Sequence, residues 1–251
     1  MEILPRKHMN LFLKIRSDFM IYAEILAGGK GTRMGKTERP KQFLMLKDKP
    51  ILIHTIEQFL KSSEIDKILV CCPKEWVSYT EVLIAEYLPD TDIDIVVGGS
   101  TRNETIMNGC KFIKEKYGLS SDDKIITHDA VRPFVTERII SDNIKALEES
   151  SAVDTVVAAT DTIVESLDGK VISNIPNRAF MYQGQTPQSF NIEELINLYN
   201  SLTSEEKDIL TDACKIFSIK GYKVAIVNGE SYNIKITNIT DLKIADALSS
   251  E

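Results

Sequence analysis

Short apolar runs alternate with helix-length segments along most of this chain, and this rhythm restricts the possible folds more than any other feature. Runs with strand character lie at residues 21–26, 67–72, 93–97, 124–127 and 154–159. Segments with helical periodicity separate them, at residues 50–61, 75–87, 104–117 and 136–149. Near-continuous apolar strands joined by helices are typical of a mainly parallel sheet covered by helices on both faces. We therefore predict an α/β fold with its ligands at the carboxyl ends of the strands.

The rhythm breaks between residues 160 and 190. Short strand-like pieces at 162–166, 170–172 and 180–183 surround an Asp168-Gly169 pair, which favours a tight hairpin turn. A piece of this size cannot hold a core of its own, so we predict a protruding β-arm that packs on a second copy of the chain to form a homodimer. The core pattern then resumes, with helices at 192–200, after Asp212 and at 241–248, and strands at 224–227 and 233–237.

Composition limits the classes of partner. The chain has 251 residues, of which 43% are hydrophobic, and a net charge of -7. We expect residues 20–251 to form one domain and residues 1–19 to be a loosely ordered extension without the features of a secretory signal. No apolar run approaches the ~20 residues of a membrane span, and the acidic balance argues against nucleic acid. Four scattered cysteines indicate a reducing compartment, so we predict a cytoplasmic protein without a membrane partner.

A glycine-rich loop follows the first strand, where backbone amides can face an anion. It contains Ala27, Gly28, Gly29 and Gly31. A P-loop would need its opening glycine at Lys30, and a dinucleotide fingerprint would need its third glycine at position 34, so both registers fail. The remaining pattern, Gly-x-Gly-Thr-Arg followed by a Pro-Lys pair, resembles the signature of nucleotidyltransferases that make nucleoside-diphosphate sugars and alditols.

Two cations flank this loop, Arg33 and Lys41. Joining a phosphate monoester to a nucleotide brings together two polyanions, and the transition state adds charge at the α-phosphorus, so positive charge must converge there. The amides of residues 28–31 can hold a triphosphate, Arg33 can take phosphate oxygens in a fork, and Lys41 can act as a point charge. This chemistry requires no covalent nucleophile.

Seven motifs in order resemble those of the cytidylyltransferase family that includes the methylerythritol-phosphate and ribitol-5-phosphate enzymes. They begin at residues 27, 33, 40, 98, 128, 185 and 235 and cover essentially the whole chain from residue 20. The segments 161–166, 175–178, 210–216 and 233–237 are more similar to the ribitol-5-phosphate branch. The resemblance implies a Rossmann-like fold of the nucleotide-diphospho-sugar transferase type. It also implies transfer of the cytidylyl group of CTP to D-ribitol 5-phosphate, giving CDP-ribitol and pyrophosphate, with a role in teichoic acid and cell wall biogenesis.

Residues outside the glycine loop are assigned partly by this resemblance. It implies recognition of the base by Gly99 and Ser100, and phosphate contact by Arg102 and Thr105. It also implies alditol phosphate binding by four further residues: Arg132, Thr162, Arg178 and Thr211. Thr162 and Arg178 fall on the predicted arm, so we expect them to complete the site of a partner subunit.

Two candidates follow from position in a strand. Asp129 comes directly after an apolar strand, where a carboxylate facing a triphosphate can hold Mg²⁺. Its neighbour His128 is more simply a hydrogen-bonded structural residue, because the reaction requires no proton from it. Lys235 alternates with Ile234 and Ile236, so it should point away from the core and toward the α-phosphate.

Three other functions remain open on the sequence alone. The same chemistry on 2-C-methyl-D-erythritol 4-phosphate is the nearest. A non-catalytic nucleotide-binding module that acts through its arm belongs to a different class, although retention of Arg33 and Lys41 disfavours it. A phosphate-loop ATPase using Lys36 is disfavoured by the spacing of its glycines.

Overall fold

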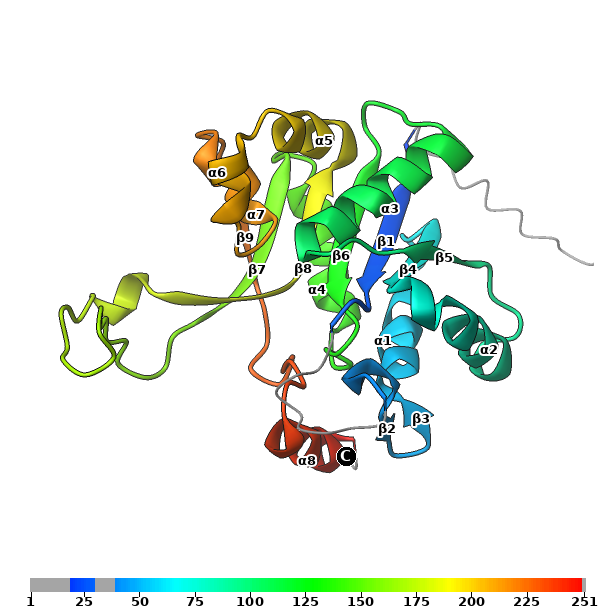
Figure 1. Cartoon of the computed structure of the whole chain (residues 1–251), viewed down its shortest axis with the longest axis horizontal. Coiled ribbons are helices and arrows are strands. Elements are labelled where there is room, and N and C mark those ends of the chain that lie inside the picture. Colours follow the sequence, from blue (N-terminus) through cyan, green and yellow to red (C-terminus); the bar gives the residue numbers. More distant parts are fainter. Residues whose placement is uncertain (1–18, 30–38, 250–251) are drawn as a thin grey trace, which may run out of the picture.

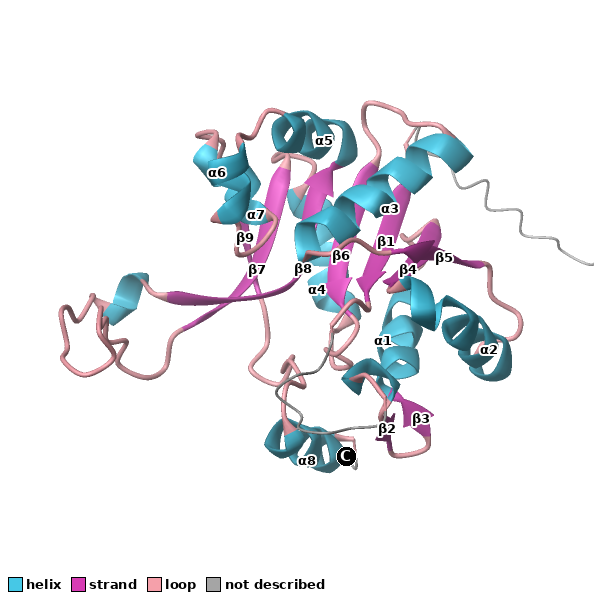
Figure 2. Ribbon diagram, viewed as in Figure 1, coloured by secondary structure: helices cyan, strands magenta, loops and turns pink. Residues whose placement is uncertain are grey.

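The computed structural model describes residues 19–29 and 39–249, and its centre is a seven-stranded sheet (Figures 1 and 2). The strand order is β5-β4-β1-β6-β8-β7-β9. In chain order the strands are β1 (Ile21–Leu26), β4 (Lys67–Cys72), β5 (Ile93–Val97), β6 (Lys124–Asp129), β7 (Ala152–Ala158), β8 (Tyr182–Asn191) and β9 (Ala225–Asn228). All described neighbours in this sheet pair in parallel except at β8, which is antiparallel to β6 and β7. The predicted α/β fold with a mainly parallel sheet is confirmed.

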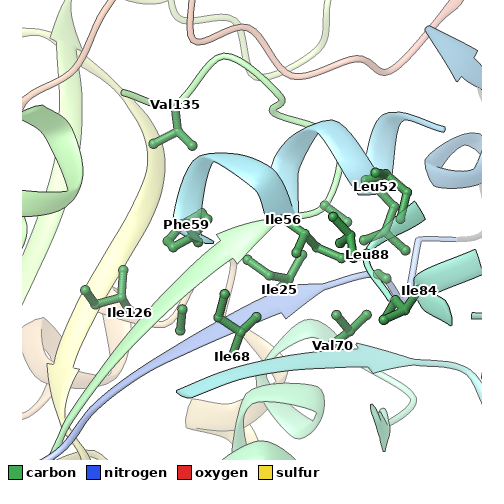
Figure 3. Packing of buried hydrophobic residues seen from close by; sticks show 14 of the residues in the cluster. Ile25, Leu52, Ile56, Phe59, Ile68, Val70, Ile84, Leu88, Ile126 and Val135 are labelled. Carbon is green, nitrogen blue, oxygen red and sulfur yellow. The ribbon is translucent and has the colours of Figure 1, made fainter. Parts of the chain in front are cut away.

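Helices cover both faces of the sheet, as predicted. One face carries α1 (Ile51–Leu60), α2 (Val77–Tyr87) and α4 (Glu137–Ala146), and the other carries α3 (Arg102–Tyr117), α5 (Ile192–Asn200) and α7 (Cys214–Ile219). Strand β1 shows why both faces are filled, since Ala23 and Ile25 join the first core cluster while Tyr22 joins the second. In Figure 3, Ile56 and Phe59 of α1 lie over Ile25 and Ile68 of the sheet.

The remaining elements are short. They are the two-stranded β2 (Met45–Leu46) and β3 (Lys49–Pro50), α6 (Ser204–Asp208), α8 (Ile239–Leu248) and the 3-10 turns η2 (Lys41–Phe43), η3 (Lys74–Trp76) and η4 (Arg178–Phe180). Within the part of the chain that the model describes, each helix is too short or too polar to cross a membrane.

Three predicted strands are wrong, namely 233–237 and the arm pieces 162–166 and 170–172. The segment 233–237 has no strand pairing, because it crosses the end of the sheet beyond β6, where Ile236 N donates instead to Val131 O at 2.9 Å. The arm contains a single isolated bridge, Glu165 to Asn174, in place of the predicted hairpin strands. A lone two-stranded ribbon without a covering layer has little to stabilise it. The turn itself is present, with Asp168 Oδ1 accepting from the amides of Lys170 and Val171.

The arm is the segment between β7 and β8, residues 159–181, and it extends well away from the sheet in Figure 1. Its prediction as a protrusion is confirmed, although its second half runs into β8, a strand that the sequence reading did not identify in full. The predicted loose order of residues 1–19 lies outside the described residues except for Phe19, which packs against the first core cluster.

The strand order fixes where a ligand can bind. From β1 the chain first adds β4 and then β5 on one side, and it next adds β6 on the other side of β1. The direction of winding therefore reverses between β1 and β6. The loops that leave these two strands therefore diverge and leave a crevice at their carboxyl ends. Residue 27 after β1 and residue 130 after β6 lie at this point.

Candidate active site

A cavity of about 310 Å³ opens at this crevice, a size within the range of small-molecule sites. Its walls come from the end of β1, the η2 turn, the start of α3, the end of β6 and the segment before α8. Nine residues that we predicted from the sequence line it: Gly28, Gly29, Lys41, Gly99, Ser100, Arg102, Thr105, Asp129 and Lys235. The topology thus brings together side chains that lie up to about two hundred positions apart in the sequence.

The wall of the cavity that contains Gly28 and Gly29 is attached to the sheet through β1 and to the η2 turn. Ala27 is buried, and its carbonyl accepts a 2.6 Å hydrogen bond from Gln42 Nε2. This bond places the neighbouring Lys41 against Gly29, where a Cβ would meet Lys41 Cε at 3.5 Å. Lys41 is 8% exposed, so its ammonium group is largely desolvated beside the glycine amides. Electrostatic attraction to an anion is stronger there than at an open surface.

A tight turn before α3 forms the opposite wall. Thr101 caps the helix by accepting from Glu104 N, and Glu104 Oε2 accepts from Ser100 N at 2.8 Å. Gly99 N donates to Thr105 Oγ1 at 3.0 Å. A Cβ on Gly99 would lie 2.3 Å from Glu104 Cβ, so only glycine fits this position. The turn therefore presents a fixed backbone edge to the cavity, which suits recognition of a planar polar ring.

Positive charge converges on Asp129 at the cavity floor. Lys235 Nζ lies 2.8 Å from Asp129 Oδ2, Arg132 Nε lies 3.4 Å from the same oxygen, and Arg102 Nε lies 3.8 Å from Oδ1. Burial alone would raise the pKa of the Asp129 carboxyl, but the charges of Lys235, Arg102 and Arg132 hold it well below its usual range. The carboxylate therefore stays ionised, and three cations around one anion leave the floor positive.

His128 lies under this floor and is a structural residue, in agreement with the sequence interpretation. It is fully buried, with Nε2 3.0 Å from Arg132 O and Nδ1 3.0 Å from Thr186 Oγ1. A carbonyl can only accept, so Nε2 carries the proton and the Thr186 hydroxyl donates to Nδ1. Burial lowers the pKa of His128 to about 4, which keeps the ring neutral at physiological pH.

Five other predicted residues lie off the cavity wall. Ala27 lies just behind it, as described above. Arg132 is 8% exposed and lies beneath the floor, where its Nη1 donates to Asn233 O at 2.7 Å. Thr162 and Arg178 lie on the arm, and Arg178 Nη1 donates to Thr160 O at 2.7 Å. Thr211 is exposed on the loop before α7. Gly31 and Arg33 lie outside the described residues, so their roles stay predictions.

Several cavity residues received no role from the sequence. The cavity is also lined by Leu26, Gln42, Thr101, Ala130, Val131 and Thr237. Gln42 and Thr237 stand within motifs that we had singled out, one position after Lys41 and two positions after Lys235. The Thr237 hydroxyl donates to Asp241 Oδ2 at 2.5 Å, so it joins the cavity to the start of α8. Adjacency to a charged motif residue is the signal that could have marked both of them.

This arrangement suits binding of a polyanion. The described lining provides glycine amides, two lysines and an arginine around a deep floor, while its one described imidazole neighbour, His128, has both nitrogens engaged. The Ser100 hydroxyl donates to the Glu104 carboxylate, and the described lining of the cavity contains no imidazole that would activate it as a nucleophile. Charge stabilisation at a phosphate group is therefore the chemistry that these residues can provide.

Comparison with known proteins gives consistent matches. The family model for 2-C-methyl-D-erythritol 4-phosphate cytidylyltransferase, IspD, matches residues 21–251. A curated ribitol-5-phosphate cytidylyltransferase of Lactiplantibacillus plantarum is 59% identical over 229 residues, which cover 91% of this chain and 98% of that protein.

Solved structures agree with the family match. The 4-diphosphocytidyl-2C-methyl-D-erythritol synthase of Anaerococcus prevotii is 28% identical, with a TM-score of 0.76 over 93% of this chain and 97% of that one. The Francisella tularensis 2-C-methyl-D-erythritol 4-phosphate cytidylyltransferase is 26% identical, with a TM-score of 0.75 over 91% and 99%.

Proposed function

The chain belongs to the IspD family of cytidylyltransferases and is thus a nucleotidyltransferase, and from that premise we propose that it transfers the cytidylyl group of CTP to D-ribitol 5-phosphate. The products are CDP-ribitol and pyrophosphate. The choice of alditol follows the Lactiplantibacillus plantarum relative, which is 59% identical and carries that name, over the more distant methylerythritol enzymes. We extend the proposal to a cytoplasmic role in teichoic acid and cell wall biogenesis, on the ground of the family resemblance.

The observation that carries the proposal is the convergence of Lys41, Arg102 and Lys235 on one cavity at the ends of β1 and β6. The phosphate of the alditol attacks the α-phosphorus of CTP, a new P–O bond forms, and the bond to pyrophosphate breaks in line with it. Negative charge grows on the equatorial oxygens and on the leaving group. Lys41 and Lys235 stabilise that charge from fixed positions, which costs no reorganisation during the reaction.

The base and the phosphates of CTP occupy opposite walls in this proposal. Gly99 and Ser100 present backbone groups to the cytosine edge, and the amides of Gly28 and Gly29 receive the triphosphate. Arg102 reaches the same phosphates, because its Nη1 and Nη2 are buried without a hydrogen-bond partner among the described residues. An anionic ligand would supply the missing acceptors.

Magnesium fits the floor as an ion shared with the nucleotide. The described residues contain no cluster of three His, Cys, Asp or Glu side chains, so a protein cage is not formed there. Asp129 lines the cavity, and the described residues that approach it most closely, Lys235 and Arg132, contact Oδ2, so Oδ1 can supply one oxygen ligand. Phosphate oxygens and water would complete the octahedral set that Mg²⁺ prefers. When bound, the ion would neutralise part of the triphosphate charge and favour departure of pyrophosphate.

The alditol phosphate binds between two subunits in this proposal. Arg132, Thr162, Arg178 and Thr211 are its candidate contacts, and Thr162 and Arg178 lie on the arm, which extends away from the sheet in Figure 1. The arm would reach the site of a partner subunit, so that a homodimer holds two composite sites.

The deciding experiment is an assay of pyrophosphate release with CTP and each of two substrates, D-ribitol 5-phosphate and 2-C-methyl-D-erythritol 4-phosphate. We expect rapid release with ribitol 5-phosphate, loss of release on chelation of divalent cations, and recovery on addition of Mg²⁺. Faster release with the methylerythritol substrate would reverse the choice of alditol. CTP binding by calorimetry without turnover on either substrate would indicate a nucleotide-binding module instead.

A mixing experiment tests the shared site. An Arg178→Ala chain and a Lys41→Ala chain should each have little activity alone, whereas their mixed dimer holds one site with both residues intact. Random pairing then restores about a quarter of the wild-type specific activity. Mixtures that stay inactive, although light scattering shows that they are dimers, would rule out sharing between subunits.

A further inference from the structure

Lys235 is held at the cavity by a segment that has no strand pairing of its own. Residues 233–237 are irregular, and Lys235 is 38% exposed, yet its ammonium lies 2.8 Å from Asp129. A lysine has a long flexible stem, so a fixed position requires a fixed backbone. The backbone of residues 233–237 must therefore be held by hydrogen bonds to other parts of the chain.

Asn233, which lies two residues before Lys235 and is fully buried, makes hydrogen bonds that hold this backbone. Its Nδ2 donates to Thr186 O at 2.9 Å and to Gln185 Oε1 at 3.1 Å, both on β8. Its own carbonyl accepts from Arg132 Nη1 at 2.7 Å. Both ends of this residue are therefore tied to elements that precede it by more than forty positions.

These bonds close a ring. Asn233 Nδ2 reaches Thr186 O, Thr186 Oγ1 accepts from Asp129 N at 3.2 Å, Asp129 Oδ2 lies 3.4 Å from Arg132 Nε, and Arg132 Nη1 returns to Asn233 O. The ring joins the end of β6, the loop after it, β8 and the last segment before α8. It fixes Asp129 and the backbone of Lys235 relative to each other, independently of any ligand.

We infer that Asn233 is a positioning residue for Lys235, and that it acts through this ring of hydrogen bonds with Thr186, Asp129 and Arg132. The inference rests on the proposed function, in which Lys235 stabilises charge at the α-phosphate of CTP. Asn233 itself does not line the cavity, so it touches neither substrate. Its contribution to the rate comes from the reduced range of positions open to the lysine ammonium, since a displacement of about 1 Å can cost about 100-fold in rate.

A double-mutant cycle tests this inference. Asn233→Ala should lower kcat about 10- to 100-fold in the wild-type background. In the Lys235→Ala background the same substitution should lower kcat by less than about 3-fold, because the residue that it positions is already gone. A general loss of folded protein would lower both backgrounds by the same factor. Equal losses in both backgrounds, or an unchanged kcat for Asn233→Ala, would overturn the inference.

The cycle is also measured on the dissociation constant of CTP by calorimetry, which needs no turnover. Weaker CTP binding in Asn233→Ala but not in the Lys235→Ala background supports the inference even if the proposed reaction fails, and equal effects refute it. If Asn233→Ala folds poorly, the double-mutant cycle is measured with Asn233→Ser, which keeps one hydrogen-bond donor.

Asn143 on α4 provides a matched control. It is also fully buried and makes hydrogen bonds to Ile139 O, Thr155 Oγ1 and Ser189 Oγ, but it belongs to no part of the ring. Asn143→Ala should lower the melting temperature while its effect on kcat is the same with and without Lys235. Coupling of Asn143 to Lys235 as strong as that of Asn233 would show that the ring has no special role.

Discussion

The cavity floor and the arm both depart from the usual distribution of side chains between core and surface. The floor buries charged groups, whereas the arm exposes apolar ones. Around the floor the chain buries charged groups, including Asp129, Arg132 and Lys41. Along the arm it exposes large apolar groups, and Leu167 is 88% and Phe180 73% exposed. Globular proteins normally expose charged side chains and bury large apolar ones, so each region departs from what folding alone would favour.

The difference lies in where the compensation comes from. The buried charges at the floor are paired within one chain, since Asp129 has three cationic neighbours within 4 Å. The apolar side chains of the arm are not covered by the described residues, namely 19–29 and 39–249, and would need a surface from elsewhere. Under the proposed function, the described nucleotide contacts come from one subunit, and the arm would act on the site of a partner subunit.

Removal of a cavity cation should have the largest effect on activity. Lys41→Ala should lower kcat for pyrophosphate release about 100- to 1000-fold, since it deletes one fixed charge at the reacting phosphate. We expect the variant to fold normally, because Lys41 lines the cavity and does not belong to the apolar core. The measurement is steady-state kinetics together with thermal unfolding.

Lys111→Ala is the matched control for that prediction. Lys111 lies on the exposed face of α3 in an ion pair with Glu115, and pairs of this type contribute little. Its kcat should equal that of the wild type. If the two lysine variants lose the same activity, the charge of the cavity is not what drives the reaction.

The arm gives the next largest effect. Phe180→Ser should weaken dimerisation about 10- to 100-fold, because burial of one large apolar side chain contributes roughly 1.5–3 kcal/mol. Sedimentation equilibrium measures the dissociation constant. Val82→Ser on α2 removes an apolar side chain that is 61% exposed outside the arm, and it should leave the constant unchanged. Equal dissociation constants for the wild type and Phe180→Ser would mean that the arm does not mediate assembly.

The two regions also differ in how well the sequence predicted them. The bounds of β1, β4 and β5 follow the apolar runs residue for residue, and β1 and β4 are buried on both faces, whereas β5 is a partly exposed edge strand. The cavity residues on the glycine loop and after β6 follow from strand ends and charge. The ring around Asn233 could not be predicted, since it depends on contacts between β8 and a segment without periodicity.

The arm marks the limit of such prediction for a different reason. Its turn residues are local signals, and the turn at Asp168 is present. Its strands would depend on a partner surface, which no pattern within the chain describes. Strand β8 was recognised only in part, because Gln185 and Gln188 are polar although they are buried. The amides of both residues donate partly buried hydrogen bonds, which alternation of hydrophobicity does not predict.

The last prediction concerns a buried carboxyl group of β1 that has no hydrogen-bond partner among the described residues. Glu24 is fully buried, and both carboxylate oxygens lack a hydrogen-bond partner among the described residues. Gly109 of α3 is packed against it, because a Cβ there would lie 2.5 Å from Oε1. Burial raises the pKa of Glu24 to about 8, although the Cys71 thiol of β4 and Arg102 of α3 oppose this rise. Cys110 of α3 also faces it.

The sign of the resulting pH dependence follows from that shift. The folded pKa lies above the ordinary value of 4.5, so the stabilising contribution of neutral Glu24 is full below pH 4.5 and is lost as pH rises through about 8. Between pH 5 and pH 8 the free energy of unfolding of the wild type should fall relative to that of Glu24→Gln, by on the order of 2–4 kcal/mol. Urea denaturation at several pH values measures it.

Glu115→Gln, on the exposed face of the same helix that covers Glu24, should follow the wild-type pH profile. The Glu24→Gln and wild-type profiles will instead run parallel if Glu24 is ionised in the folded protein, and that result would require a cation to approach its carboxylate. Arg102 is the only described cation that acts on Glu24, and it is also a cavity residue. A parallel profile would therefore mean that Arg102 is shared between the core and the nucleotide, whereas the divergent profile that we expect leaves Arg102 committed to the phosphates.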